Sequence, residues 1–331
     1  MSNEEIASRL QAVISRHLGP PGTIHDLRQL TGGASRSTSL FDAEASGARH
    51  RLIMQSGGVW ADRATGLAPQ LEPEQDAQLM IAASEIGVPA PKVRAILEPA
   101  DGLGRGYITD FVEGETLGQR IVRDAKFVGA RALMAKQCGE ILAATHRIDL
   151  ARVPFLIRQD AAAHVEAHRQ IVDRFGLQLP ALDMALKWAA ENVPKGARHT
   201  VVHGDFRLGN LIVGEDGIRC VLDWELGQSG DPMQDLGWLC IRTWRFGGAP
   251  PVGGFGSRED LYTSYERASG YSINPAHVRF WEAFGNVKWV IHCLRLGMRG
   301  VAEVGIERCA IGRRIEEPLW DFLNLIEGRP E

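Results

Sequence analysis

Several features that would point to particular protein classes are scarce in this chain of 331 residues. It has no basic excess, because 37 Lys and Arg residues stand against 41 Asp and Glu residues. Little positive charge is therefore available to follow a phosphate backbone, and we expect no nucleic-acid partner. The five cysteines include no closely spaced pair, which argues against a disulfide framework and a zinc knuckle. A reducing cytoplasm is the predicted location.

Long apolar runs are missing as well. No uncharged apolar stretch approaches the roughly 18 residues that a membrane span needs, so no membrane partner is expected. The first residues lack the apolar core of a secretion signal, because Glu4, Glu5 and Arg9 interrupt them. Their apolar residues recur at helical spacing instead, which predicts an amphipathic surface helix over residues 1–18.

The remaining sequence changes character near residue 114. Before it, short β-type runs are separated by glycines, and residues 74–86 have the spacing of a single helix. The β-type runs are residues 27–30, 38–43, 50–55 and 106–112. After it the pattern is mostly helical, apart from short strands around polar loops in residues 200–225. The glycine-rich residues 247–256 are predicted to be a flexible connection, either a plain loop or a lid over a substrate.

The polar loops of residues 203–225 carry the strongest chemical signal. Asp205 is followed five residues later by Asn210, and Asp223 comes after a further short strand pair. This is the spacing of the catalytic base and the two magnesium ligands in protein kinases. Arg207 can neutralise charge on the transferred phosphoryl group. Each residue alone could merely shape a turn or end a strand, but the ordered set predicts Asp205 and Arg207 as catalytic residues, with Asn210 and Asp223 as metal ligands.

The same residues resemble the aminoglycoside phosphotransferase and choline kinase-like superfamily. Residues 203–210 and 221–238 are similar to the catalytic and metal loops of that family. The resemblance implies an α+β, protein kinase-like two-lobe fold that uses ATP and Mg²⁺. Residues 1–112 would form a small antiparallel-sheet lobe that binds nucleotide, and residues 113–331 a mainly helical lobe that binds the acceptor.

Further roles follow from this resemblance. Gly32, Gly33, Ala34 and Ser35 lie in a segment similar to the loop that covers the nucleotide phosphates. Residues 107–114 are similar to the hinge between the lobes, where backbone groups around Asp110 and Val112 would meet adenine. Asp235 would brace the catalytic loop.

Two residues near these segments are predicted to have structural roles. Asp231 is placed to cap a helix that begins at the following proline. His203 is expected to fix the backbone of the catalytic loop rather than to touch the substrate.

The chain departs from the family at one position in the first lobe. Gln55 stands where the family places a lysine or arginine that binds the nucleotide phosphates. Glutamine donates hydrogen bonds but brings no charge, so nucleotide binding is weaker than usual unless Arg49 or Arg51 compensates. The usual carboxylate partner of that cation is either Glu74 or Asp76.

The acceptor is the least defined part of the prediction. Trp281, Lys288, His292, Arg295 and Arg299 form one stripe of a predicted helix, which is either a solvated face or a wall of the cleft. As a wall it would suit a small-molecule hydroxyl acceptor that is anionic or partly apolar, and would repel polycationic aminoglycosides. Residues 87–91 are similar to a branch associated with acyl-CoA dehydrogenases and thought to phosphorylate hydroxyacyl thioesters.

Three functions therefore compete. The first is an ATP-dependent small-molecule kinase, and the second is a catalytically weak nucleotide-binding regulator or binding module. The third, a protein kinase, is disfavoured because the Ala-Pro-Glu signature is absent and because Trp224 and Glu225 follow Asp223 instead of Phe-Gly. Oligomeric state does not follow from this sequence.

Overall fold

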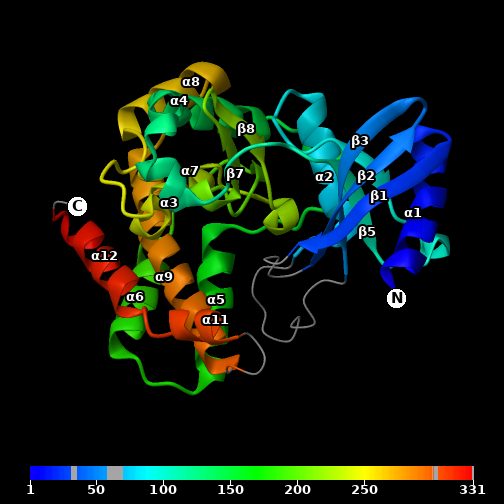
Figure 1. Ribbon diagram of the computed structural model, residues 1–331. Coiled ribbons are helices and arrows are strands. Elements are labelled where there is room, and N and C mark those ends of the chain that lie inside the picture. The colour runs from blue at the N-terminus through cyan, green and yellow to red at the C-terminus, as the bar shows by residue number, and fades with distance from the viewer. Residues whose placement is uncertain (31–35, 58–69, 300, 302–304, 330–331) are drawn as a thin grey trace.

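The structure is a computed structural model that describes residues 1–30, 36–57, 70–299, 301 and 305–329. A twisted sheet with two helices lies at one end of the molecule, and a larger helical part lies at the other (Figure 1). The predicted α+β, kinase-like architecture is confirmed. The lobe boundary at residues 112 and 113 stays a prediction. Within the described residues no helix is both long enough and apolar enough to cross a membrane.

The first part of the chain forms a five-stranded antiparallel sheet in the order β1-β2-β3-β5-β4. Its elements are α1 (Asn3–Leu18), β1 (Pro21–Leu30), β2 (Ser37–Ala45), β3 (Ala48–Ser56), α2 (Pro73–Glu85), β4 (Val93–Ile96) and β5 (Gly106–Asp110). The predicted strands and both predicted helices are present. β4 was not predicted.

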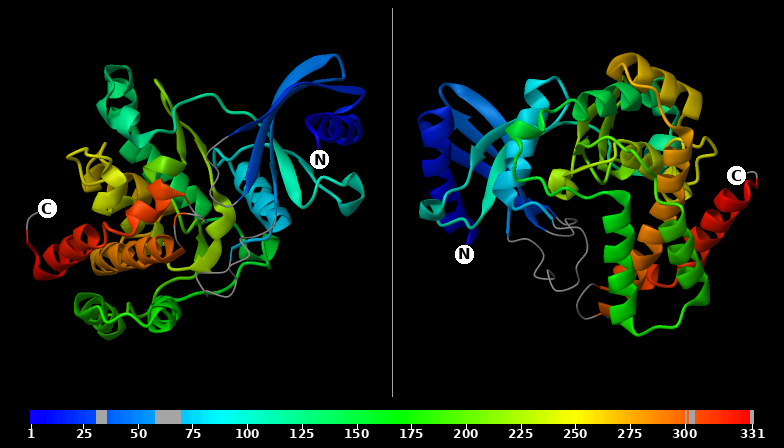
Figure 2. Two further views of the ribbon diagram at one scale, coloured as in Figure 1. Left: turned by 60° about the horizontal axis from the view of Figure 1, so that its bottom comes forward. Right: turned by 180° about the vertical axis from the view of Figure 1, so that it is seen from behind.

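The two helices cover opposite faces of this sheet. α1 begins with a capping box between Ser2 and Glu5, and its buried apolar residues pack against Phe41 and Leu52. α1 lies on the side that faces away from the helical part, whereas α2 lies between the sheet and that part (Figure 1 and Figure 2). Since side chains alternate along a strand, Gln55 and its partner Tyr107 lie on the α2 side.

The second part is mainly helical and contains two short antiparallel strand pairs, β6 with β9 and β7 with β8. Its helices are α3 (Gly118–Arg123), α4 (Val128–Thr145), α5 (Ala161–Phe175), α6 (Pro180–Glu191), α7 (Met233–Cys240), α8 (Arg258–Ser269), α9 (Pro275–Arg299), α11 (Ile306–Ile311) and α12 (Glu316–Glu327). Its strands are β6 (Thr200–Val202), β7 (Leu211–Gly214), β8 (Gly217–Val221) and β9 (Gln228–Gly230). The long helix α9 packs against α5, α6, α7 and α12 and forms the centre of this part (Figure 2).

The glycine-rich residues 247–256 contain buried side chains and backbone hydrogen bonds. Val252 and Phe255 are buried, and Val252 exchanges backbone hydrogen bonds with Gly256. The N–H of Gly253 also donates to the carbonyl oxygen of Leu239 in α7, at 3.2 Å. The segment is therefore a packed turn, because two apolar side chains anchor it. It fits the plain-loop alternative, and its flexibility stays a prediction.

Candidate active site

The catalytic-loop sequence begins where β6 ends, at Val202, and its backbone makes a sharp turn at Gly204. The φ angle of Gly204 is +82°, a value that disfavours side chains, and a Cβ there would lie 2.4 Å from the carbonyl oxygen of Leu226. Only glycine fits this turn. The turn brings Asp205 back towards the metal-loop residues that follow β8.

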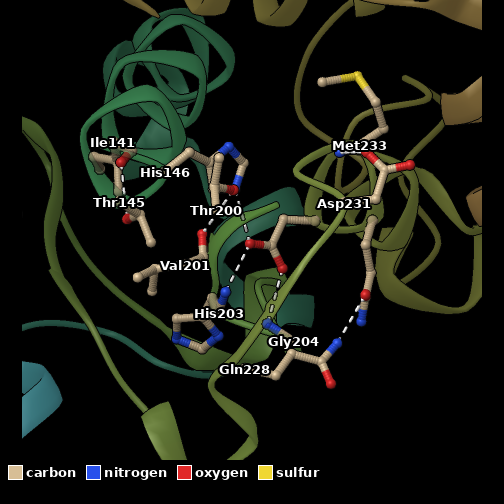
Figure 3. A network of polar contacts seen from close by, with 12 residues as sticks. Ile141, Thr145, His146, Thr200, Val201, His203, Gly204, Gln228, Asp231 and Met233 are labelled. Atoms are coloured by element: carbon tan, nitrogen blue, oxygen red, sulfur yellow. Dashed lines mark hydrogen bonds and ion pairs between the residues drawn. The ribbon is translucent and has the colours of Figure 1, made fainter. Parts of the chain in front are cut away.

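The side chain of Asp235, in the first helical turn of α7, holds the loop backbone at His203 and Gly204 in place. Its two carboxylate oxygens accept hydrogen bonds from the backbone N–H groups of His203 and Gly204, at 2.8 and 2.9 Å, and a third comes from the His146 ring at 3.1 Å (Figure 3). Burial acts to raise the pKa of Asp235, but the interactions with His146 and His203 outweigh it and lower that pKa. Asp235 thus stays ionised and lies where it can brace the loop, as predicted.

His203 shapes the loop through both ring nitrogens. Its Nδ1 accepts from the backbone N–H of Asp205 at 3.2 Å, so its Nε2 donates to the carbonyl oxygen of Leu222 at 3.1 Å. Burial lowers the pKa of His203, which favours this neutral form. The ring joins the two loops that carry Asp205 and Asp223, in agreement with its predicted structural role.

Asp205 lies among three hydrogen-bond donors. Asn210 Nδ2 donates to Asp205 Oδ2 at 2.7 Å, and Arg207 Nε donates to Oδ1 at 3.1 Å. The indole N–H of Trp238, in α7, also donates to Oδ1, at 2.8 Å. The structure therefore brings Asp205, Arg207 and Asn210 together. Trp238 joins them, although nothing in its sequence surroundings pointed to this contact.

Asp223 is the second predicted metal ligand. Its backbone has a φ angle of +66°, which is uncommon outside glycine, and the preceding Leu222 N–H donates to the Asn210 carbonyl oxygen at 2.8 Å. Burial, together with the negative charges of Glu225 and Asp205, raises the pKa of the Asp223 carboxyl to about 8. A cation bound here would therefore offset the repulsion among these neighbouring carboxylates.

This donor set fits a magnesium ion. The Asn210 amide nitrogen is occupied by Asp205, so the amide oxygen could serve as a metal ligand together with the carboxylate of Asp223 on the neighbouring loop. The described residues hold no group of three or more His, Cys, Asp and Glu side chains arranged for a metal. Mg²⁺ in nucleotide sites characteristically takes only one or two protein carboxylates, with phosphate and water oxygens as its other ligands.

The predicted nucleotide residues are only partly described. Gly32, Gly33, Ala34 and Ser35 lie outside the described residues. The Asp110 side chain forms two hydrogen bonds with Arg94, each 2.7 Å long, and its backbone N–H donates to the carbonyl oxygen of Lys92 at 3.0 Å. The contact between this backbone and adenine stays a prediction. Val112 follows the end of β5 by two residues.

The cation that pairs with the α2 carboxylate of Asp76 is not one of the residues considered in the sequence analysis. Asp76 forms a buried ion pair with Arg36, just before β2, whereas Glu74 pairs with Arg105 on the surface. Arg49 pairs with Asp42, and Arg51 stacks over the Phe111 ring. The side chains of Arg49 and Arg51 thus have partners away from Asp76, and their compensation for Gln55 stays a prediction.

The stripe on α9 is not a solvated face. Trp281 is buried and donates its indole N–H to Asp231, which also accepts from the Met233 N–H and so caps α7 as predicted. Burial lowers the pKa of Lys288 to about 8, although the charges of Asp205 and Asp235 act to raise it. The Lys288 ammonium lies over the Trp238 ring, 4.8 Å from its centroid, and no ion pair to it is found in the described part of the chain.

A row of aromatic rings continues from this lysine along the catalytic loop. The ring centroids of Trp238 and Trp244 are 5.3 Å apart, those of Trp244 and Trp289 are 4.7 Å apart, and Trp289 stacks on His292 at 5.1 Å. The Arg207 guanidinium lies over Trp244 at 4.5 Å. The wall beside Asp205 is thus aromatic and positively charged.

The comparisons with known proteins identify the fold and the family. The family model for the APH phosphotransferase enzyme family matches residues 26–271. A proposed aminoglycoside phosphotransferase from Ralstonia eutropha superposes with a TM-score of 0.77, at 22% identity, over 98% of this chain and 99% of that one. The aminoglycoside phosphotransferase APH(2'')-Ib, solved with ADP, has a TM-score of 0.60 at 15% identity, over 98% and 99% of the two chains.

Curated relatives match this chain over only part of their own length. Acyl-CoA dehydrogenase family member 11 from Rattus norvegicus is 24% identical over 97% of this chain and 42% of its own length. The chain spans less than half the length of the curated relatives that it matches.

Proposed function

Because this chain belongs to the APH phosphotransferase enzyme family, we propose that it transfers the terminal phosphoryl group of ATP to a hydroxyl group of a small molecule. One observation carries the proposal: the Asp205 carboxylate is held by Asn210, Arg207 and Trp238 beside the loop that presents Asp223. A general base, two oxygen ligands for a metal and a nearby cation are the parts that phosphoryl transfer requires.

Each residue would have a separate task. Asp205 accepts the proton of the attacking hydroxyl group, and the Asn210 amide oxygen and Asp223 hold the metal. Bound Mg²⁺ and ATP would supply the phosphoryl group and neutralise its charge. Arg207, fixed between Asp205 and the Trp244 ring, adds positive charge where negative charge develops during transfer.

The wall beside Asp205 favours an acceptor that is anionic and partly apolar. Lys288 supplies an ammonium group, and the tryptophan row supplies flat apolar surface. The buried indole N–H of Trp244 has no hydrogen-bond partner among the described residues, which suits an acceptor oxygen. An aminoglycoside, with several ammonium groups, would be repelled by Lys288 and Arg207.

The first experiment is calorimetric titration of the protein with ATP, with and without Mg²⁺, together with Asp205→Asn and Asp223→Ala. We expect magnesium-dependent binding that Asp205→Asn keeps and Asp223→Ala loses. Asp216→Asn, which changes an exposed carboxylate, is the matched control. Absence of binding at millimolar ATP would support the alternative function, a kinase fold used as a binding module.

Turnover is then tested with acceptors of opposite charge. Hydroxyacyl-CoA thioesters come first, because the curated relatives are named as acyl-CoA dehydrogenase family members, and kanamycin is the cationic comparison. Asp205→Asn should reduce the rate about 100-fold or more, as the loss of a general base does. Lys288→Met should raise the KM of an anionic acceptor while leaving ATP binding unchanged. Preferential phosphorylation of kanamycin would contradict the proposed acceptor class.

A further inference from the structure

A buried ion pair stands between the sheet and α2, on the side of the sheet that faces the catalytic loop. Arg36 Nη1 donates to Asp76 Oδ2, and Arg36 Nη2 donates to the carbonyl oxygen of Leu71 at 3.1 Å. The side chains of Arg36 and Asp76 are 5% and 2% exposed. A guanidinium and a carboxylate are buried only at a high desolvation cost, so a pair kept here calls for a reason other than stability.

The strand register places Arg36 next to Gln55. Thr38 in β2 lies opposite Gln55 in β3, and Gln55 lies opposite Tyr107 in β5. Arg36 precedes Thr38 by two residues, and its Cα lies near the backbone of Gly57. With the two-residue alternation of side chains, Arg36, Gln55 and Tyr107 share one face of the sheet. Diagonal neighbours on such a face are close enough for a long side chain to span the gap.

Hydrogen bonds join these three residues into one cluster. The Tyr107 hydroxyl oxygen accepts from Arg36 Nη1 at 3.3 Å and lies 2.8 Å from Asp76 Oδ2. It also bonds to the Gln55 side-chain oxygen. A hydroxyl group carries one proton, so Tyr107 donates either to Gln55 or to Asp76 while it accepts from Arg36. Gln55 is therefore linked to the cluster by its hydrogen bond to Tyr107 and does not supply the positive charge.

The cluster also reaches the metal-binding loop. Arg36 Nη2 lies 3.7 Å from a carboxylate oxygen of Glu225, two residues after Asp223. Two buried polar atoms of the pair, Arg36 Nε and Asp76 Oδ1, have no hydrogen-bond partner in the described part of the chain. A buried cation with a free donor, beside carboxylates that favour a metal ion, is suited to a phosphate group.

We propose that Arg36 is the residue that binds the phosphate groups of the nucleotide, in place of the cation that Gln55 lacks. Asp76 and Tyr107 hold its guanidinium, and Gln55 is a positioning residue that acts through Tyr107. The positive charge that the family places on β3 is supplied here by the residue that precedes β2, on the same face of the sheet. This inference rests on the proposed nucleotide-dependent function and assigns one of its binding residues.

The test compares two ligands that share adenosine and differ in the magnesium-bound phosphate groups. Adenosine and Mg·ADP are titrated calorimetrically into the wild type and into Arg36→Gln/Asp76→Asn, which removes both charges of the ion pair so that Asp76 is not left without its cation. We expect Mg·ADP affinity to fall about 10-fold to 100-fold, because one charge-assisted hydrogen bond or two are lost. Adenosine affinity should not change. Arg49→Gln, which removes an arginine from the same sheet outside the cluster, is the matched control.

A second variant restores the charge on the other strand. Arg36→Gln/Gln55→Lys keeps the Asp76 carboxylate and places one cation beside it. It therefore tests the proposal even if the neutral variant does not fold. We expect it to bind Mg·ADP in preference to adenosine, as the wild type does. Loss of that preference would count against the proposal.

The remaining outcomes separate this inference from the proposed function. If the neutral variant keeps the wild-type preference for Mg·ADP, or loses affinity for both ligands equally, Arg36 is only a structural residue and the inference is overturned. If the wild type itself does not bind Mg·ADP, the proposed function fails and this inference fails with it.

Discussion

At the scale of single residues, the orientation of Asp205 depends on groups from separate parts of the chain. Asn210 and Arg207 are its neighbours in the loop and belong to the sequence pattern that predicted the site. Trp238 comes from α7, 33 residues later, and donates its indole N–H to the same carboxylate. No local pattern marks a tryptophan for such a contact, because it arises only when α7 packs behind the loop.

Removal of this indole donor should affect the chemical step. Trp238→Phe keeps an aromatic ring under Lys288 but takes away the hydrogen bond that orients Asp205. We expect kcat to fall about tenfold, in proportion to one hydrogen bond to a charged group, while calorimetric binding of Mg·ATP stays unchanged. Trp320→Phe, at an exposed tryptophan, is the control. An unaltered kcat would mean that Asn210 and Arg207 alone orient the carboxylate.

At the scale of secondary-structure elements, one aspartate joins two helices. Asp231 Oδ1 accepts from the Met233 N–H at the start of α7, and Oδ2 accepts from the indole N–H of Trp281 in α9, at 2.8 Å. The helix-capping part of this role was predicted from the aspartate and the proline after it. The bond to α9 was not, because the two residues are 50 positions apart.

Asp231→Ala should therefore destabilise the protein more than the loss of a helix cap alone. It removes the cap and leaves the Trp281 N–H buried without a partner, at a combined cost of about 2–4 kcal/mol in the free energy of unfolding. Asp231→Asn keeps an acceptor oxygen and should lose less. Urea unfolding of the three proteins at one pH measures the difference. Equal stability of the alanine and asparagine variants would show that the side-chain oxygen is unimportant.

The elements that the sequence missed share a physical cause. β9 has only three residues, without β-branched or aromatic side chains, and β4 has four residues shortly after two prolines. Runs this short carry little periodicity, and their pairing partners decide whether they become strands. Arg36 was missed as the partner of Asp76 for a related reason, since the expected position was on β3 and only the strand register shows that β2 reaches the same point.

At the scale of the whole molecule, the helical part buries histidines that must stay neutral. Burial and the nearby charge of Lys288 lower the pKa of His168, on α5, to about 4, and its Nδ1 donates to the His164 carbonyl oxygen at 2.7 Å. An unfolded histidine has a pKa of about 6.5. Between these two values the unfolded chain binds a proton that the folded chain does not, so stability falls as the pH drops below 6.5.

This linkage predicts a loss of stability in mild acid. For His168 alone, the free energy of unfolding should be lower by about 1–2 kcal/mol at pH 5 than at pH 7. His168→Gln can keep the hydrogen bond but does not titrate, so its stability should change less between these two pH values. His17→Gln, at an exposed position, should behave as the wild type does. Urea unfolding at both pH values is the measurement, and an unchanged pH dependence in His168→Gln would contradict the assignment.

The face of the sheet shared by Arg36 and Gln55 also bears on how such chains diverge. Two neighbouring strands offer positions from which a cation can reach the same carboxylate, so an ancestor that carried both cations could lose either one and remain active. If Arg36 has the role proposed above, glutamine at position 55 shows that the phosphate-binding cation is supplied from the β2 side instead of from β3. A survey that sorted family members into enzymes and inactive homologues by the β3 cation alone would then place this chain in the wrong group.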